Sequence, residues 1–274
     1  IETYLVWIPR YKYELWNVGV NDVTSSQVPK TIPITFESKD TTKSTGSTDG
    51  TYLTHPAFTF GSTELNGIWV SKFEVTGSIS AITSKPSNSS IRNQTVGNFW
   101  NALKAYDTSD TSHMMKNTEW GAVAYLSASI YGKNSEILKN NNSSYLTGCG
   151  GVSSSTSGSS SCLNQFGTVD AYPQSTTGNI SGIFDMSGGA WEYMAACASG
   201  YIGSSGLTLD TINSNSNYFD LYSSTSYNNR ILGDSTGELG PFVNNKSSWY
   251  QSFADFPNSS VPWFARGANY GDTA

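Results

Sequence analysis

The sequence predicts an α+β domain with a mixed sheet, two helices and long irregular surface loops. Strand-like alternation near the N-terminus and after residue 66, two stretches of helical spacing, and long Ser/Thr/Asn/Gly segments predict this class. The 274 residues, 13% of them aromatic, can bury a substantial core, and no linker separates two such cores. We therefore expect a single domain over 1–274, with surface insertions at 17–53, 133–165 and 201–230.

Two segments are predicted as strands. In residues 4–16, Tyr11, Tyr13 and Leu15 alternate with charged residues, which gives one apolar and one charged face. Residues 66–76 open with an Asn-Gly pair, which favours a tight turn, and continue in a strand-like pattern.

Two helices are predicted between residues 95 and 132. Thr95 can cap the first, because a threonine hydroxyl there accepts a backbone N–H of the first turn. The apolar residues of this helix recur at positions that form one buried stripe. They are Val96, Phe99, Trp100 and Leu103. Asn117 or Thr118 can cap the second helix, and Gly132 can end it.

The composition favours a secreted or surface-exposed protein. Only 13% of the residues are charged, against about 25% in average soluble domains. The net charge of −6 and the lack of a basic stripe argue against nucleic acid as a partner. No apolar run approaches the roughly 18 residues of a membrane span, so we expect none in this chain. The chain opens without a basic leader and is expected to be mature or truncated.

The three cysteines predict one disulfide and one buried thiol. Cys149 and Cys162 flank a Ser/Gly-rich segment that has almost no means of burying itself. A bridge between them would stabilise the fold by about 3 kcal/mol through chain entropy, and it requires an oxidising compartment. The alternative is two unrelated thiols. Cys197 has small apolar neighbours and no nearby cation, so it is expected to be buried and unreactive.

Residues 182–193, GIFDMSGGAWEY, combine a special backbone with a fixed polar pattern. Gly188 and Gly189 allow backbone angles that other residues avoid, and Asp185 and Glu192 place carboxylates on either side of that turn. The segment is therefore predicted to be a structural turn. The apolar residues expected to be buried around it are Phe184, Met186 and Trp191.

This segment resembles the signature of formylglycine-generating enzymes and of the C-type-lectin-like proteins that share their fold. Three further segments resemble that family in the family's order. They are 67–76 (GIWVSKFEVT), 115–125 (MKNTEWGAVAY) and 263–270 (WFARGANY). The resemblance covers most of the chain from Asn66 onward and implies a C-type-lectin-like fold. It assigns structural roles to Gly182, Arg266 and Gly267 beside those of the turn.

The chain departs from the enzymes of this family at its cysteines. Formylglycine-generating enzymes carry a redox-active cysteine pair just after the segment corresponding to Arg266-Gly267, and no cysteine follows Cys197 here. Without those thiols a formylglycine-type oxidase is disfavoured, and the chain is expected not to be an enzyme. His55 and His113 have no ligand-spaced partners beside them, and no phosphate-loop pattern is found.

No cofactor is expected, and calcium at the turn is the less favoured alternative. Relatives hold calcium near this turn, and Asp185 and Glu192 could supply oxygen ligands. However, Gly189 replaces the asparagine of the family, which removes one oxygen. The favoured interpretation is that both carboxylates accept backbone and indole hydrogen bonds that hold the turn.

Among the non-catalytic relatives, the chain looks most like C-type-lectin-like display proteins of bacteria and their phages, including targets of diversity-generating retroelements. Its N-terminus is also similar to pilin-linked surface proteins of Gram-positive gut bacteria. The resemblance implies an extracellular ligand-binding head, such as an adhesin, on a bacterial cell surface or a phage virion. Its expected partner is a protein or glycan on a cell surface. The alternative is a structural subunit that assembles with its own copies into a pilus-like filament.

The resemblance implies a ligand surface just after the Arg266-Gly267 segment. Asn269, Tyr270 and Asp272 are the expected ligand-binding residues, because Tyr offers a large contact area while Asn and Asp offer adaptable hydrogen bonds. Aromatic residues of the 201–230 insertion are expected to contribute. They are Tyr218, Tyr222 and Tyr227. The final strands of the family are expected beyond residue 274.

Overall fold

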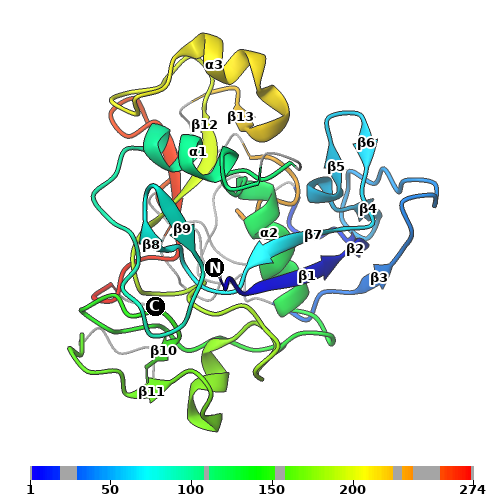
Figure 1. The fold of residues 1–274 in the computed structure, drawn as a ribbon. Coiled ribbons are helices and arrows are strands. Elements are labelled where there is room, and N and C mark those ends of the chain that lie inside the picture. Colours follow the sequence, from blue (N-terminus) through cyan, green and yellow to red (C-terminus); the bar gives the residue numbers. More distant parts are fainter. Residues whose placement is uncertain are drawn as a thin grey trace.

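The computed structural model describes residues 2–18, 30–107, 111–151, 158–224, 230–236 and 254–272. Helices and short strands are mixed along these residues, as predicted for the α+β class (Figure 1). The strands of the described part form separate sheets of two or three strands, in place of one continuous mixed sheet. No helix in these ranges is both long enough and apolar enough to cross a membrane.

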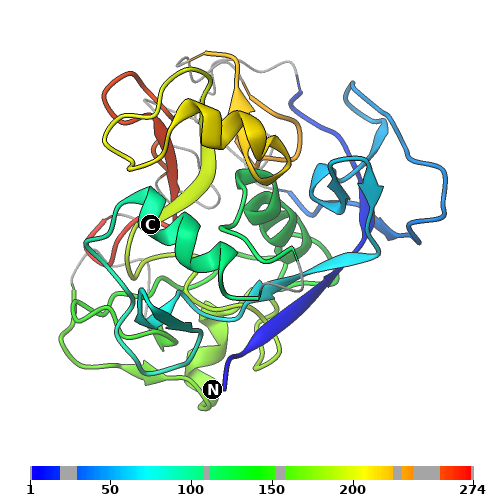
Figure 2. The same ribbon diagram turned by 45° about the horizontal axis from the view of Figure 1, so that its top comes forward.

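The N-terminal strands form a ribbon and a small sheet (Figure 2). β1 (Leu5–Pro9) pairs antiparallel with β7 (Gly67–Ser71). β2 (Tyr11–Glu14) lies between β3 (Ile34–Phe36) and β4 (Tyr52–Thr54). The apolar face predicted for residues 4–16 is confirmed, because its three members are fully buried. These are Tyr11, Tyr13 and Leu15.

Two short hairpins flank the ribbon. η1 (Pro56–Phe58) leads into β5 (Thr59–Phe60), which pairs with β6 (Thr63–Glu64). β8 (Thr76–Ser78) pairs with β9 (Ala81–Thr83) after the end of β7. The two hairpins lie on opposite sides of the view in Figure 1.

α1 (Val96–Lys104) confirms the first predicted helix. Thr95 caps it, because its hydroxyl accepts the backbone N–H of Asn98 at 3.2 Å. All four apolar residues of the predicted stripe belong to one hydrophobic cluster. Val96 and Trp100 are buried in it, and Phe99 and Leu103 pack at its margin.

α2 (Asn117–Ser127) is the second predicted helix and is buried along most of its length. Its N-cap is Lys116, one residue before the expected capping positions. The shift arises because Glu119 reaches back and accepts the Lys116 backbone N–H at 2.8 Å. The helix ends before Gly132, with Ala128 as its C-cap.

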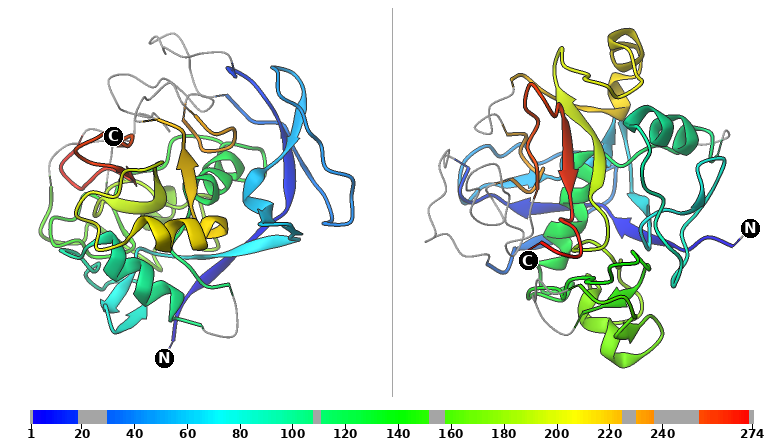
Figure 3. Two further views of the ribbon diagram at one scale, coloured as in Figure 1. Left: turned by 90° about the horizontal axis from the view of Figure 1, so that it is seen from above. Right: turned by 90° about the vertical axis from the view of Figure 1, so that its left-hand side faces the viewer.

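A three-stranded sheet joins distant parts of the chain. β12 (Glu192–Ala198) lies between β13 (Asp220–Tyr222), which is parallel to it, and β14 (Trp263–Arg266), which is antiparallel. Figure 3 shows β12 and β14 side by side. Their register pairs Glu192 with Arg266, so the end of the 182–193 segment lies beside the last strand.

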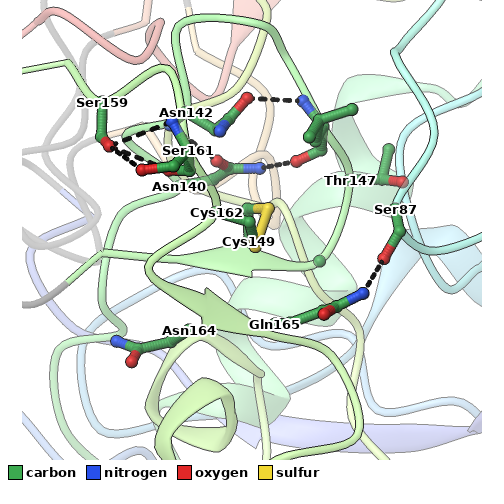
Figure 4. Close-up of a disulfide and its surroundings, with 12 residues drawn as sticks. Ser87, Asn140, Asn142, Thr147, Cys149, Ser159, Ser161, Cys162, Asn164 and Gln165 are labelled. Carbon is green, nitrogen blue, oxygen red and sulfur yellow. Dashed lines mark hydrogen bonds between the residues drawn. A yellow bond between two sulfur atoms is a disulfide. The ribbon is translucent and has the colours of Figure 1, made fainter.

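The predicted disulfide is present. Cys149 and Cys162 are bonded, with 5.2 Å between their Cα atoms. Figure 4 shows the bridge near polar side chains, among which Ser159 Oγ hydrogen-bonds to Ser161 and the Asn140 amide donates to the Leu146 carbonyl. Cys197 is buried as predicted, and burial raises the pKa of its thiol to about 12.

The predicted insertion at 133–165 is partly built into the core. Lys139 is buried, and so are three consecutive asparagines, 140–142. β10 (Cys149–Gly150) pairs with β11 (Asn164–Gln165), and η2 (Val169–Gln174) follows. The expectation of a surface excursion fails here because buried polar side chains find partners that composition does not indicate, such as the Asn140 amide, which donates to the Leu146 carbonyl and to Asp185 Oδ1.

The other two predicted insertions also contribute to the core. In 17–53, Ile32 and Ile34 are buried. In 201–230, Thr208 caps α3 (Leu209–Ser214), and η3 (Ser216–Tyr218) leads into β13. Single apolar residues in polar surroundings give no periodic pattern, so the sequence alone did not indicate this burial.

The main hydrophobic core draws on residues from both ends of the described chain, from Ile8 to Phe264. α2 lies at its centre. The Tyr11 hydroxyl donates to the backbone carbonyl of Ala122 at 2.6 Å, and the rings of Tyr13 and Tyr125 lie 4.6 Å apart. The N-terminal sheet is therefore fixed to the same helix that supports the 182–193 turn.

Candidate functional site

The 182–193 turn requires its glycines. Gly188 and Gly189 have φ angles of 81° and 70°, a region that residues with a side chain rarely adopt. A Cβ on Gly188 would lie 2.1 Å from the carbonyl oxygen of Asn140. A Cβ on Gly189 would lie 2.3 Å from Glu74 Oε1, so the Glu74 carboxylate occupies the space that a larger residue would need.

Asp185 is a buried hydrogen-bond acceptor at the centre of the turn. Its carboxylate accepts the Gly148 backbone N–H and the side-chain amides of Asn140 and Gln174, each at 2.9 Å to Oδ1. Burial raises the pKa of Asp185, and these donors oppose the rise. Asp185 itself has a φ of 64°, which Asp and Asn tolerate better than most residues.

Glu74 is a second buried carboxylate, which the sequence did not indicate. Its Oε1 accepts the Ala190 backbone N–H at 2.8 Å, and its Oε2 accepts the Ser90 hydroxyl. Burial raises the pKa of Glu74 well above its ordinary value, and the charges of Asp185 and Glu192 raise it further. Glu74 thus links the end of the β7 segment to the turn.

Glu192 completes this group of carboxylates. Burial raises its pKa, the charge of Asp185 adds to the rise, and a side-chain hydrogen bond with Trp120 lowers it. The structure therefore supports the interpretation in which the carboxylates of the turn accept backbone, amide and indole hydrogen bonds. Within the described residues, no group of three or more His, Cys, Asp and Glu side chains is arranged to hold a metal ion.

The prediction that Trp191 is buried is wrong, although Phe184 and Met186 are buried as expected. Trp191 is half-buried. Successive side chains of a strand point to opposite faces, so Trp191 and Tyr193 share one face of the β12 segment while Glu192 points to the other. The strand therefore directs the Glu192 carboxylate towards the interior and the Trp191 indole towards the surface, which is the reverse of what the hydropathy of the two side chains predicts.

Trp191 and Tyr193 line a cavity of about 230 Å³ at the C-terminal face. Asn269 contributes to it from the turn after β14. The segment that precedes α1 supplies three polar side chains to the same cavity, and these are Arg92, Asn93 and Gln94. Its remaining walls are Ile91, Phe99, Tyr145 and Ala190.

A stack of side chains stiffens one wall of this cavity. The guanidinium of Arg92 lies 3.8 Å from the ring centroid of Tyr145, and the ring of Tyr270 meets Tyr145 edge-on at 5.1 Å. The backbone N–H of Tyr270 donates to the carbonyl oxygen of Gly189 at 3.0 Å. The stack is thereby attached to the 182–193 turn.

The structure gives different positions to the three predicted C-terminal residues. Asn269 lines the cavity, and Tyr270 supports its wall. Asp272 holds the turn, because its Oδ2 accepts the Asn269 backbone N–H at 2.9 Å and its carbonyl accepts Lys139 Nζ. Only Asn269 thus lies directly on the cavity.

The tyrosines predicted from the 201–230 segment do not join this cavity. Tyr218 packs 4.7 Å from Phe60, with Lys104 Nζ 3.7 Å above its ring. The proposal of Tyr222 as a ligand residue is wrong, because Tyr222 is 1% exposed and its hydroxyl donates to Asp234 Oδ2 at 2.9 Å. Tyr227 lies outside the described residues.

The other residues to which the family resemblance assigns structural roles, Arg266, Gly267 and Gly182, hold buried contacts around the turn and do not line the cavity. Arg266 is fully buried, its Nε donates to Asn117 Oδ1 at 2.8 Å, and its guanidinium stacks 4.4 Å from the Trp120 ring. Burial lowers the pKa of Arg266 to about 10. Gly267, with a φ of 82°, accepts the Gly188 N–H, and the Gly182 carbonyl accepts Lys72 Nζ at 3.0 Å.

Sequence reasoning missed most of the cavity lining. Tyr193 could have been found, because it is two positions from Trp191 on the same strand face. Arg92, Asn93 and Tyr145 belong to irregular segments that carry no periodic signal. No protein-family model matches this sequence, and no curated protein matches it either.

Proposed function

We propose that the chain is an extracellular, non-enzymatic ligand-binding domain of the C-type-lectin-like fold, with its site at the C-terminal face. The observation that carries the proposal is the cavity of about 230 Å³ at which Asn269 meets Trp191 and Tyr193. A concave site with aromatic walls and a few convergent polar groups is typical of ligand recognition.

The chemistry of this cavity suits a glycan or a protein ligand. Trp191 and Tyr193 offer rings for stacking, and Tyr193 is 41% exposed. Amide groups of Asn269 and Gln94 can donate and accept hydrogen bonds with hydroxyl or peptide groups. Arg92 adds a cation whose position is fixed by Tyr145. Rings with a polar tip and adaptable amides are the side chains that binding loops favour.

The frame behind the cavity supports the proposal because it holds these groups before a ligand arrives. Tyr270 is fixed by its bond to Gly189, and Asn269 is fixed by Asp272. A preorganised site loses less conformational freedom on binding.

The cysteines agree with an extracellular and non-enzymatic role. The Cys149–Cys162 disulfide is compatible with an oxidising compartment, such as the surface of a bacterial cell or a phage. Cys197 has its pKa raised to about 12 by burial, so it remains a thiol at neutral pH. The chain thus provides no reactive thiol pair for the oxidase alternative.

Binding of the labelled protein to a printed glycan array and to immobilised bacterial surface proteins tests the proposal. Replacing both Trp191 and Asn269 with alanine should weaken binding to the captured ligand by about 100-fold, which corresponds to about 2.7 kcal/mol. Tyr201→Ala is the matched control, because Tyr201 is 45% exposed and does not line the cavity. Unchanged binding by a double variant with an unchanged melting temperature would refute the site.

A filament subunit is the second candidate, and one surface favours it. Leu5, Trp7 and Trp69 are 45%, 41% and 63% exposed on the β1–β7 ribbon. Exposed apolar groups on neighbouring strands are typical of surfaces that another molecule covers. Light scattering after size-exclusion chromatography separates the two candidates, because a filament subunit should form assemblies whose size grows with protein concentration.

A further inference from the structure

The cavity at the C-terminal face carries charge of one sign. Arg92 is the charged side chain of its described lining, which contains no Asp, Glu or Lys. The other hydrogen-bonding groups of this lining include three side-chain amides, those of Asn93, Gln94 and Asn269. The whole chain has a net charge of −6, so this positive lining contrasts with the overall charge. A cation fixed in the wall of a cavity favours a ligand with an anionic group.

The guanidinium of Arg92 is held in place without an acidic partner. It lies 3.8 Å from the ring centroid of Tyr145. Within the described residues it forms no ion pair. A guanidinium over an aromatic ring keeps its N–H groups in its own plane, where a carboxylate can accept two of them in parallel. Arg92 is therefore prepared to receive a planar anion.

The carboxylates behind the cavity wall leave this charge uncompensated. Burial raises the pKa of Glu74 well above its ordinary value and that of Glu192 to about 8, so both remain mostly protonated at neutral pH. Asp272, in the turn after β14, has the Lys139 ammonium beside it, bound to its backbone carbonyl. The charge of Arg92 thus remains available to a ligand.

A second cavity, of about 490 Å³, shares the side chains of Trp191 and Tyr193 with the first. Its described lining contains three glutamates and neither Lys nor Arg. His113 is the basic side chain there, and it is already bound to Glu119 at 3.0 Å. The two cavities therefore favour different ligand groups, and an anion is favoured only beside Arg92.

The size and the polar groups of the first cavity favour a sugar over a peptide. Its volume is about 230 Å³, which is below the range for drug-sized ligands, about 300 to 1,000 Å³. Such a volume suits one ring-sized group, whereas an extended peptide would leave most of its backbone outside. Each amide of the lining both donates and accepts hydrogen bonds, as a sugar hydroxyl does. The rings of Trp191 and Tyr193 offer apolar faces to the C–H groups of a pyranose.

We propose that this cavity binds an acidic glycan, through a sugar ring that carries a carboxylate, with the carboxylate on Arg92 and the ring against Trp191 and Tyr193. Uronic acids and sialic acids share this chemistry. The amides of the lining bind the hydroxyl groups of the same ring. This inference rests on the proposed binding role of the cavity and specifies the class of its ligand.

A printed array of matched acidic and neutral glycans tests the inference with the full chain. Glucuronides are paired with glucosides, and sialosides with their carboxamides, so the members of a pair differ only at the carboxylate. In at least one series the acidic member should bind at least about tenfold more tightly, which corresponds to about 1.4 kcal/mol. The series that binds distinguishes uronic from sialic acids.

The other outcomes separate this inference from the proposed function. Equal binding of the acidic and neutral members would overturn the acidic class and leave the binding role intact. So would binding to immobilised surface proteins without binding to any glycan. Binding to neither kind of ligand would overturn both. Glycan binding that survives in the Trp191→Ala/Asn269→Ala double variant would place the site elsewhere.

Three variants test the part played by Arg92. Arg92→Gln removes the charge, so it should weaken binding of the acidic glycan at least about tenfold and abolish the preference over its neutral partner. Arg92→Lys keeps the charge but not the planar fork, so its loss should be smaller. Lys39→Gln is the matched control, because it removes one charge from an exposed residue outside the cavity and should change nothing. An unchanged preference in an Arg92→Gln variant with the parent melting temperature would overturn the assignment.

Discussion

Replacing Asp185 with alanine is expected to lower the free energy of unfolding by about 4 kcal/mol. The substitution leaves three buried donors without their acceptor, namely the Gly148 N–H and the amides of Asn140 and Gln174. An unsatisfied buried donor costs about 1 to 3 kcal/mol, and the two amides can partly reorient, so about 1 kcal/mol for each is a reasonable value. Alanine at a φ of 64° adds about 1 kcal/mol.

Two further variants at Asp185 separate these contributions. Asn keeps an oxygen at the Oδ1 position and tolerates the positive φ, but its Nδ2 replaces the Oδ2 that lies 3.0 Å from the Gly148 backbone N–H, so the stability of Asp185→Asn should lie between those of the parent protein and the alanine variant. Glycine also lacks the acceptor but adopts a positive φ without strain, so Asp185→Gly should be about 1 kcal/mol more stable than the alanine variant.

Urea denaturation at pH 7, with the disulfide intact, measures the three free energies of unfolding. An equal dependence of the unfolding free energy on urea concentration in all variants would show that they unfold between comparable states. Equal stability of the alanine and asparagine variants would show that Asp185 contributes nothing through its hydrogen bonds.

Three other outcomes are expected. Gly188→Val should destabilise the fold far more than Gly200→Val in thermal melts. Both glycines have φ above 80°, but only a Cβ at Gly188 would lie 2.1 Å from another atom. Equal losses of melting temperature would contradict this prediction. Alanine at both Cys149 and Cys162 should lower the unfolding free energy by about 3 kcal/mol. Non-reducing peptide mapping of the parent protein should recover the two cysteine peptides linked, and recovery of separate peptides would show that the bridge is absent in solution. Stability should fall as pH rises from about 4.5, the ordinary pKa of a glutamate, towards 8, because the folded pKa of Glu192 is raised to about 8 and the unfolded chain loses the proton first. Glu192→Gln should flatten that part of a pH–stability profile by up to about 1.4 kcal/mol per pH unit, and a profile that does not change would argue against a raised pKa.

Local patterns of the sequence determined several elements of this protein. The Thr95 cap and the apolar stripe predicted α1, and the alternation in residues 4–16 predicted the buried face of β2. Two cysteines that flank a Ser/Gly segment predicted the disulfide. Each of these depends on residues close together in the sequence, so short-range chemistry is sufficient to indicate it.

Only the tertiary structure decided the orientation of the signature residues and the composition of the cavities. Trp191 faces a cavity and Glu192 faces inward because β12 begins at Glu192 and pairs with β14, more than sixty positions later in the chain. Tyr222 is buried with its hydroxyl between the donor Asn117, 105 positions away in the sequence, and the acceptor Asp234, 12 positions away. Burial of a polar or aromatic side chain depends on partners that fold against it, and hydropathy along the sequence does not contain that information.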